Sequence, residues 1–115
     1  MGTNQKADLL QGTLDLLILK SLQHEPMHGF GVAVRIGQMS QAMLTVEQGS
    51  LYPALYRLED QGWIKAEWGV SENNRKAKFY SITPAGLEKL EREEREWAET
   101  ASIVACFLTL GEKDA

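Results

Sequence analysis

Cysteine is nearly absent from this chain of 115 residues, because Cys106 stands alone. One cysteine cannot build an intrachain disulfide framework, and a reducing cytoplasmic setting is the simplest inference. No run is long and apolar enough to cross a membrane, and residues 1–6 lack the apolar core of a signal peptide. His24 and His28 flank Pro26 without the clustered ligands that a zinc site needs, so we expect no metal. No glycine-rich phosphate loop follows a strand, so we expect neither a cofactor nor an enzyme.

An excess of positive charge is also missing, since the formal net charge is −4 and the pI is near 5.2. Taken alone, this acidity argues against nucleic-acid binding, which is typical of basic chains. Residues 1–83 carry eight Lys/Arg and eight Asp/Glu, whereas residues 84–115 carry four and eight, so the whole acidic excess lies in the last segment. A neutral first part with a local cationic patch can bind DNA if the acidic segment points away, although weakly to non-specific DNA.

The stretch from Glu47 to Ile64 contains the clearest helical pattern in the chain. Leu51, Leu55 and Leu58 fall at i, i+4 and i+7, which is one stripe of a helix. The side chains roughly opposite are Gly49, Pro53, Tyr56 and Asp60. A short helix of this kind, over about residues 47–61, suits insertion into a DNA major groove. An ordinary amphipathic surface helix fits this segment equally well.

Two starts for this helix remain open. Thr45 with Gln48 has the spacing of a capping box, but it places Pro53 inside the helix, where a hydrogen bond is lost. Ser50 as the capping residue would instead place Pro53 within the first turn. Gly62 ends the helix in either case.

A β-hairpin with a basic tip is predicted after the helix. Residues 64–70 alternate with the period of a strand, and residues 78–82 are rich in strand-forming side chains. The turn between them, residues 71–76, contains two asparagines, which tolerate a left-handed backbone. Arg75, Lys76 and Lys78 place three cations within four positions. A helix followed by a cationic hairpin, over residues 64–82, favours a winged helix-turn-helix, although a solvated hairpin tip is the simpler alternative.

Two earlier helices are predicted to support this arrangement. Residues 9–22 are apolar on most sides, which indicates a largely buried helix. The segment around Pro26 breaks it. A second helix is expected over about residues 28–41. Its inward set is predicted to be Phe30, Val32, Ala33, Ile36 and Met39.

A long helix is predicted at the C-terminal end. Thr83 is a good N-cap and Pro84 a good first residue, and the helix should run to about Leu110. Its seam follows spacings of three and four and is interrupted once, by Glu94: Leu87, Leu90, Glu94, Trp97, Ala101, Val104 and Leu108. A helix of about 27 residues spans about 40 Å, which is too long for a small head to cover. A two-fold dimer is therefore expected, with a helix folded back along its own head as the alternative.

These elements predict a mainly α fold with a small β-hairpin. A winged helix-turn-helix occupies residues 1–83 and a C-terminal dimerisation helix occupies residues 84–115. The chain resembles the PadR family of transcriptional regulators over about residues 9–110. The resemblance rests on six segments in order: Leu10-Gln11-Gly12-Thr13-Leu14, His28-Gly29-Phe30, Gly49-Ser50-Leu51-Tyr52-Pro53-Ala54-Leu55, Leu58-Glu59-Asp60-Gln61-Gly62-Trp63-Ile64, Arg75-Lys76-Ala77-Lys78-Phe79-Tyr80 and Ile82-Thr83-Pro84-Ala85-Gly86.

The resemblance implies a homodimeric cytoplasmic repressor that binds a pseudo-palindromic operator in double-stranded DNA. Carried onto this chain, it implies DNA contacts from the helix residues Ser50, Tyr52 and Arg57 and from the wing residues Arg75, Lys76 and Lys78. Gly31 replaces a bulkier residue, and Ala77 interrupts the basic wing, so contacts from the second helix are in question and wing affinity should be modest. A winged-helix assembly module without specific DNA binding is the alternative function.

The resemblance also bears on an effector. In multidrug-responsive members of the family, two tryptophans sandwich flat aromatic ligands at the dimer interface, and Trp68 and Trp97 resemble those positions. Stacking in an apolar cleft would be the physical basis. We favour the simpler interpretation, in which both indoles fill the dimer core, and keep a small planar aromatic ligand as the alternative.

Overall fold

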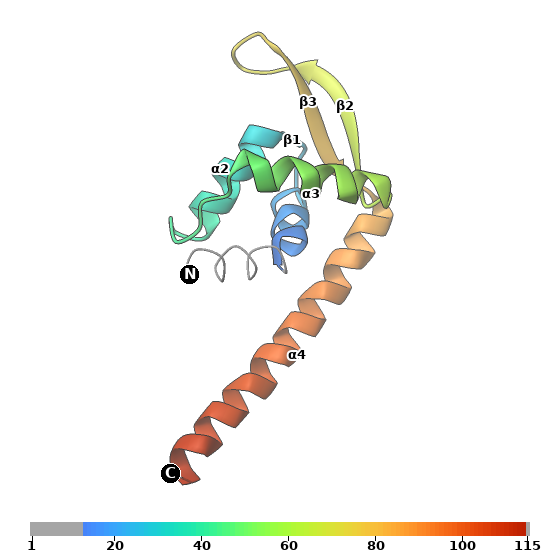
Figure 1. The fold of residues 1–115 in the computed structure, drawn as a ribbon. Helices are drawn as coiled ribbons and strands as arrows, with labels where there is room; N and C mark the ends of the chain where they lie inside the picture. Colours follow the sequence, from blue (N-terminus) through green and yellow to red (C-terminus); the bar gives the residue numbers. More distant parts are fainter. Residues whose placement is uncertain (1–12, 115) are drawn as a thin grey trace.

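The computed structural model describes residues 13–114, and within them it shows four helices and a small antiparallel sheet (Figure 1). A first helix covers residues 13–21. The elements that follow are β1 (Met27–His28), α2 (Gly29–Met39), α3 (Gln48–Asp60), β2 (Ile64–Val70), β3 (Lys76–Ile82) and α4 (Pro84–Asp114). The predicted fold class, a winged helix-turn-helix with a long C-terminal helix, is therefore confirmed. The part of the first helix expected before residue 13 lies outside the described residues.

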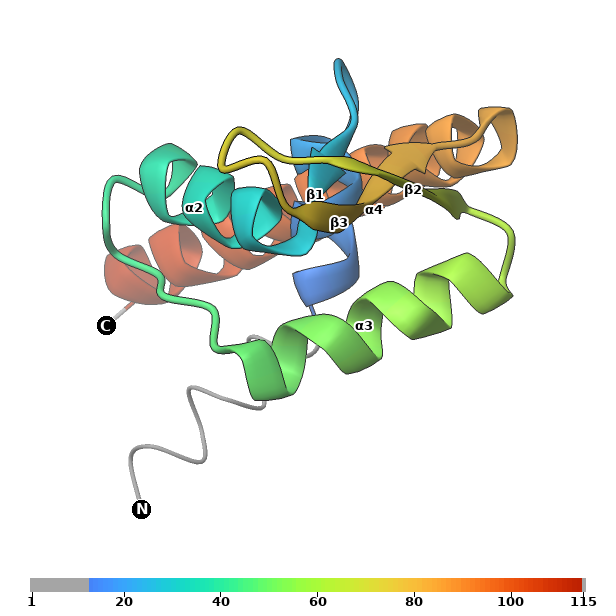
Figure 2. The same cartoon turned by 90° about the horizontal axis from the view of Figure 1, so that it is seen from above.

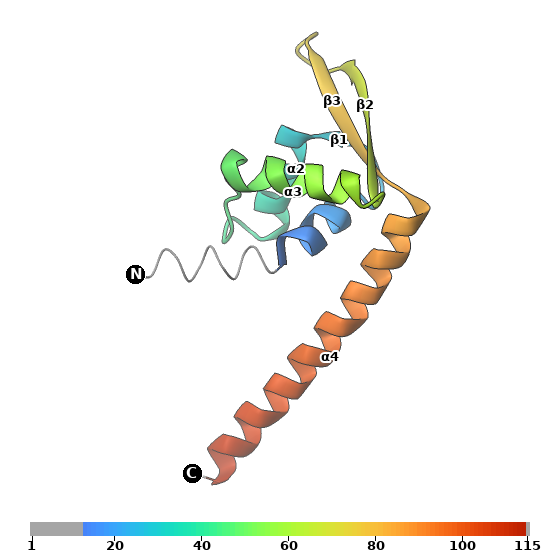
Figure 3. The ribbon, with the colours of Figure 1, turned by 45° about the vertical axis from the view of Figure 1, so that its right-hand side comes forward.

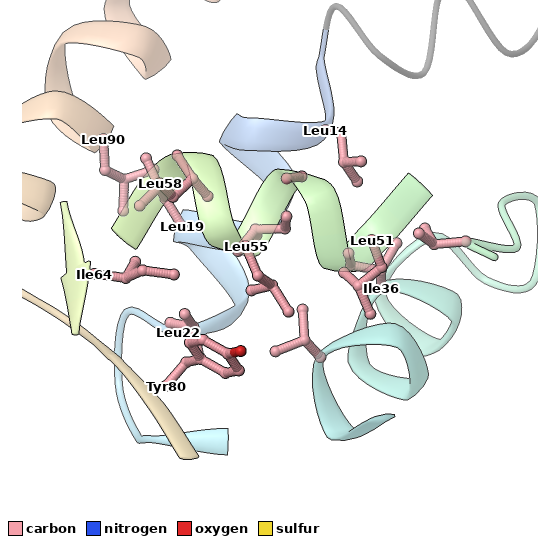
Figure 4. Close-up of a cluster of buried hydrophobic side chains, with 14 residues drawn as sticks. Leu14, Leu19, Leu22, Ile36, Leu51, Leu55, Leu58, Ile64, Tyr80 and Leu90 are labelled. Carbon is pink, nitrogen blue, oxygen red and sulfur yellow. The ribbon is translucent and has the colours of Figure 1, made fainter. Parts of the chain in front are cut away.

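The core lies where the first helix, α2, α3 and the sheet meet (Figure 4). The predicted stripe of α3 is confirmed, because Leu51, Leu55 and Leu58 are almost completely buried. The first helix contributes Leu14, Ile18, Leu19 and Leu22, and the sheet contributes Ile64 and Tyr80. Burial of this stripe leaves the opposite face of α3 free to act as a surface.

The start of α3 differs from both predicted starts. The helix begins at Gln48, and neither Thr45 nor Ser50 caps it. Glu47 occupies the cap position with an extended backbone and no side-chain hydrogen bond, and its carbonyl accepts from the N–H groups of Ser50 and Leu51, both at 3.0 Å. Burial of Val46 fixes the chain just before this point, and the exposed first turn leaves its N–H groups to water. Pro53 therefore lies inside the helix.

The predicted inward face of α2 is only partly confirmed. Val32 and Ile36 are buried as expected, but Phe30 and Met39 are 65% and 54% exposed. The helix begins at Gly29, one residue later than expected, because Nδ1 of His28 accepts from the N–H of Gly31 at 3.0 Å and makes His28 the N-cap. Gly29, Val32 and Ile36 then form the buried face, and Phe30 lies about 100° around the helix from Gly29.

The sheet has a third strand that the periodicity did not predict. The two-residue β1 pairs with β3, with Met27 opposite Tyr80 and His28 opposite Phe79, so the strand order is β1-β3-β2. A strand this short, directly after Pro26, has no detectable alternation. The hairpin β2–β3 is confirmed, but β3 begins at Lys76 rather than Lys78. Asn74 in the turn adopts a left-handed backbone with φ of 59°, as expected for its type.

A tight junction joins the wing to α4. Thr83 acts as predicted, since its Oγ1 accepts from the N–H of Gly86 at 3.0 Å, and the same hydroxyl donates to the carbonyl of Gly62 at 2.7 Å. A Cβ on Gly86 would lie 2.0 Å from the carbonyl oxygen of Trp63, so only glycine fits there. The Lys89 ammonium lies 4.6 Å from the centre of the Trp63 ring. These contacts fix the direction in which α4 leaves the head.

The helix α4 extends well beyond the head, which we define as residues 13–83 (Figure 1, Figure 3). It has 31 residues and ends at Asp114, later than the predicted Leu110. Its first half touches the head, where Leu90 is buried and Glu94 pairs with Lys20 at 3.2 Å. Every side chain from residue 101 to residue 111 is exposed, so the helix does not fold back over its full length.

Candidate nucleic-acid interface

An open groove of about 900 Å³ lies between the start of α2, the exposed side of α3 and the wing hairpin. Seen from above, the hairpin tip reaches over the start of α2, while α3 runs along the side (Figure 2). Tyr52 and Tyr56 line the groove from α3, and Arg75, Lys76 and Lys78 line it from the wing. Four of the six residues predicted to contact DNA, namely Tyr52, Arg75, Lys76 and Lys78, thus meet at one surface.

A lysine and three tyrosines form the floor of this groove. The Lys78 ammonium lies 5.6 Å from the Tyr56 ring centre and 5.8 Å from that of Tyr80. It also pairs with Glu59 at 3.6 Å. The Tyr52 and Tyr56 rings are tilted, with centroids 6.4 Å apart. Lys78 is therefore held by an acid and two aromatic faces, whereas neither Arg75 nor Lys76 forms an ion pair with another side chain of residues 13–114.

Tyr80 is the buried anchor of this cluster. Tyr80 belongs to β3, and its ring is almost fully buried. Burial, together with the nearby Tyr56, Glu59 and Tyr52, raises the pKa of Tyr80 from 10.0 to about 12. The phenol is therefore neutral at physiological pH, and it contributes to the floor as an apolar ring rather than as a charge.

The other two predicted DNA contacts lie elsewhere. Ser50 is exposed in the first turn of α3, outside the groove. Arg57 is directed to the first helix, where its Nη2 pairs with Oδ1 of Asp15. The pair is partly exposed, with 51% of the Arg57 side chain accessible, so it holds the guanidinium only weakly. Release of Arg57 from Asp15 would therefore cost little free energy.

Other groove residues were missed as site residues. His28, Phe30 and Arg35 of β1 and α2 line the groove beside the wing, and Arg35 pairs with Glu25 at 2.8 Å. The His28 and Phe30 rings are stacked with centroids 6.3 Å apart. Phe30 was assigned to the inward face although helical periodicity places it about 200° around α2 from Val32, which is buried. The 3.6-residue period was therefore the signal that could have identified Phe30 as a surface residue.

The two tryptophans considered for an effector lie on different surfaces. Trp68 is 69% exposed and lines the groove beside the wing cations. Trp97 is 52% exposed and lines a smaller hollow of about 190 Å³ between α4 and the first helix. Leu16 lines the same hollow from the first helix. The two hollows share no lining residue, so one protomer does not bring these indoles together.

Residues 13–114 contain no group of three or more His, Cys, Asp or Glu side chains placed to hold a metal ion. No helix in that range combines the length and apolar character needed to cross a bilayer.

Comparison with known proteins identifies the chain. The sequence model of the PadR-like family of transcriptional regulators matches residues 18–92, which include α2, α3, the wing and the first turns of α4. The chain belongs to the PadR-like family of transcriptional regulators. The predicted resemblance is thereby confirmed, and the family is one of regulators rather than of enzymes.

Solved structures of PadR-like regulators share this fold. A transcriptional regulator from Clostridium thermocellum is 28% identical, with a TM-score of 0.79 over 87% of this chain and 97% of its own. A PadR-like transcriptional regulator from Bacillus cereus is 29% identical, with a TM-score of 0.76 over 88% of this chain and 96% of its own. PadR of Bacillus subtilis, in complex with operator DNA, shares the fold at 21% identity, with a TM-score of 0.62 over 70% of this chain and 45% of its own.

Proposed function

We propose that this PadR-family regulator binds a pseudo-palindromic operator as a homodimer and represses transcription. The observation that carries the proposal is the groove in which the exposed side of α3 meets the wing cations. Helices of this class read base edges in the major groove, while basic wings position the protein on phosphates. Tyr52 and Ser50 would contact DNA from α3, Arg75, Lys76 and Lys78 from the wing, and Arg57 after release from Asp15.

The charge distribution supports this orientation. The acidic excess lies in residues 84–115, and α4 runs from the root of the wing in the direction opposite to the wing tip (Figure 1). Glu25 and Glu72 line the groove, but no residue of α4 does, so the acidic excess behind the low pI does not oppose DNA binding there. The single domain boundary of the proposal lies at residues 83 and 84, with the DNA-binding part before it and the dimerisation helix after it.

The homodimer is supported by the distal part of α4, residues 101–111. Val104, Phe107 and Leu108 are about half or more exposed, and no residue from 101 to 110 is charged. A helix segment that is apolar on nearly every side is expected to be buried. A second copy of α4 offers the matching surface, and a two-fold axis would duplicate the reading head.

Selection of bound sequences from random duplex DNA tests the proposal. We expect an inverted repeat whose half-sites are about one helical turn apart. Reporter expression from a promoter that carries this repeat should fall when the protein is present. Recovery of no preferred sequence, together with equal weak binding to all duplexes at every salt concentration, would favour an assembly module without specific DNA binding.

An effector is a separate part of the proposal. We favour Trp97 as a packing residue of the dimer core, and a planar aromatic ligand is the alternative for Trp68 and Trp97. Titration with planar aromatic cations, followed by tryptophan fluorescence, distinguishes them. Saturable quenching that is weakened in both Trp68→Leu and Trp97→Leu would support a ligand held between the two indoles, and no saturable quenching would count against such a pocket.

A further inference from the structure

We infer that Gly29 is a positioning residue for DNA recognition. Because Gly29 has no side chain, the Tyr52 ring can occupy the space beside it. The inference rests on the proposed function, in which Tyr52 contacts DNA from α3. Gly29 itself is buried at the first position of α2 and has no side chain that could contact a base or a phosphate.

The contact between the two residues is closer than any side chain at position 29 would allow. A Cβ added to Gly29 would lie 2.7 Å from the Tyr52 hydroxyl oxygen, 2.8 Å from Cε1 and 2.9 Å from Cζ. Real Cβ atoms essentially never come within 3.0 Å of such atoms. All three atoms belong to the outer end of the tyrosine ring, so an alanine at position 29 would displace the ring and its hydroxyl.

The ring is held on its other sides, so glycine fixes one definite position. Tyr52 packs partly against the core. Its ring lies 6.4 Å from that of Tyr56, which in turn lies under the Lys78 ammonium at 5.6 Å. A line of contacts thus runs from the start of α2 through α3 to the wing. Displacement of Tyr52 would move its hydroxyl, whereas Lys78 would keep its contacts with Tyr56 and Tyr80.

The chain offers a matched control two residues away. A Cβ on Gly31 would meet His28 and Met27 at 3.5 Å, which is ordinary van der Waals contact. Gly29→Ala and Gly31→Ala both place alanine in the first turn of the same helix, and both gain similar helix propensity. The two variants differ mainly in whether the new methyl group strikes Tyr52.

The test is a double-mutant cycle on operator affinity in the full-length protein. We expect Gly29→Ala to weaken binding about tenfold, the scale of one lost hydrogen bond to a charged oxygen, while Gly31→Ala stays within about twofold of wild type. In a Tyr52→Ala background, Gly29→Ala should add less than about twofold. The salt dependence should keep its slope in Gly29→Ala, because a neutral phenol releases no counterions from DNA.

Several outcomes overturn the inference. Wild-type affinity in Gly29→Ala, or an equal loss with and without Tyr52, would show that Gly29 does not act through the ring. If Gly29→Ala fails to fold, the Gly29→Ala/Tyr52→Ala protein decides, since a folded double variant identifies the ring as the obstacle and an unfolded one excludes it. If the wild-type protein binds no DNA sequence preferentially, the proposed function is wrong. If the wild-type protein binds its operator and Gly29→Ala binds it with equal affinity, only this inference is wrong.

Discussion

The head and the distal part of α4 differ in how far their apolar side chains are buried. In the head, Leu51, Leu55 and Leu58 of α3 are buried by the first helix, α2 and the sheet. In distal α4, Phe107 and Leu108 are 76% and 67% exposed. The head thus buries its hydrophobic pattern with its own elements and Leu90 of α4, while nothing in residues 13–114 covers the distal helix. The difference is the reason for which a dimer through distal α4 is proposed.

The largest expected effect comes from placing a charge on the exposed apolar helix. Leu108→Asp should abolish the dimer, weakening self-association by at least about 100-fold, because two carboxylates would be buried without partners. Analytical ultracentrifugation measures the change. Ser102→Asp lies on the other side of the helix from the predicted seam and should leave most of the association intact. A dimer that survives Leu108→Asp would move the interface off this surface.

The two glycines of α4 give the sharpest contrast between the regions. Gly86→Ala should lower the free energy of unfolding by about 1–3 kcal/mol, because its methyl group would overlap the Trp63 carbonyl. Gly111→Ala in distal α4 has nothing within 4 Å and should stabilise the helix by up to about 1 kcal/mol. Chemical denaturation followed by circular dichroism compares them. Equal effects in the two variants would contradict the tight junction described at Thr83 and Gly86.

The wing and α4 differ in what their cations do. Lys76→Ala should reduce the slope of log affinity against log salt by about one, because one phosphate contact is lost. Arg92→Ala removes an exposed cation from α4 and should leave the slope unchanged. Fluorescence anisotropy with labelled operator DNA at several salt concentrations provides both slopes. A slope that changes only in Arg92→Ala would place the DNA on the α4 side.

The smallest effect concerns Tyr80 and is confined to alkaline solution. The folded-state pKa of Tyr80, about 12, lies above its ordinary value of 10.0, so the phenol ionises more readily in the unfolded chain. Stability should therefore be fully present below pH 10 and fall as the pH rises from about 10 to 12. Tyr80→Phe should lose less stability over that interval than wild type, which denaturation at pH 9 and pH 11.5 measures. Parallel losses in both proteins would argue against the raised pKa.

The elements with strong periodicity were predictable, and those set by a single local contact were not. The α3 stripe, the hairpin and the Thr83 cap each rest on several residues that agree, and all three are confirmed. The start of α3 depended on the burial of Val46 and on a backbone cap at Glu47, which leave no side-chain signature. β1 consists of two residues and is visible only through its partners on β3.

The helix and wing residues of the candidate site were predictable from the sequence, but the ion pair of Arg57 and the residues of α2 were not. Tyr52, Arg75, Lys76 and Lys78 share one groove because α3 and the wing converge, as the motif order indicated. Arg57 was placed on DNA from the sequence, whereas Asp15, far away in the chain, is its partner in the folded protein. The contribution of α2 was missed because Phe30 was placed on the inward face, whereas the helical period puts it opposite the buried Val32.

The pairing of β1 with β3 gives the wing a stiff root and a free tip. Met27 and His28 hold Tyr80 and Phe79, whereas residues 70–76 pair only across the hairpin itself or form its turn. Backbone amides at the root should exchange slowly with solvent, and those of the tip quickly. In the proposed DNA complex, the tip would then be able to follow phosphates displaced by bending or by a change of groove width, while the start of α2 would keep its position beside α3. Met27 and His28 would thus divide the wing into a part that adapts to DNA shape and a part that preserves the register of α3.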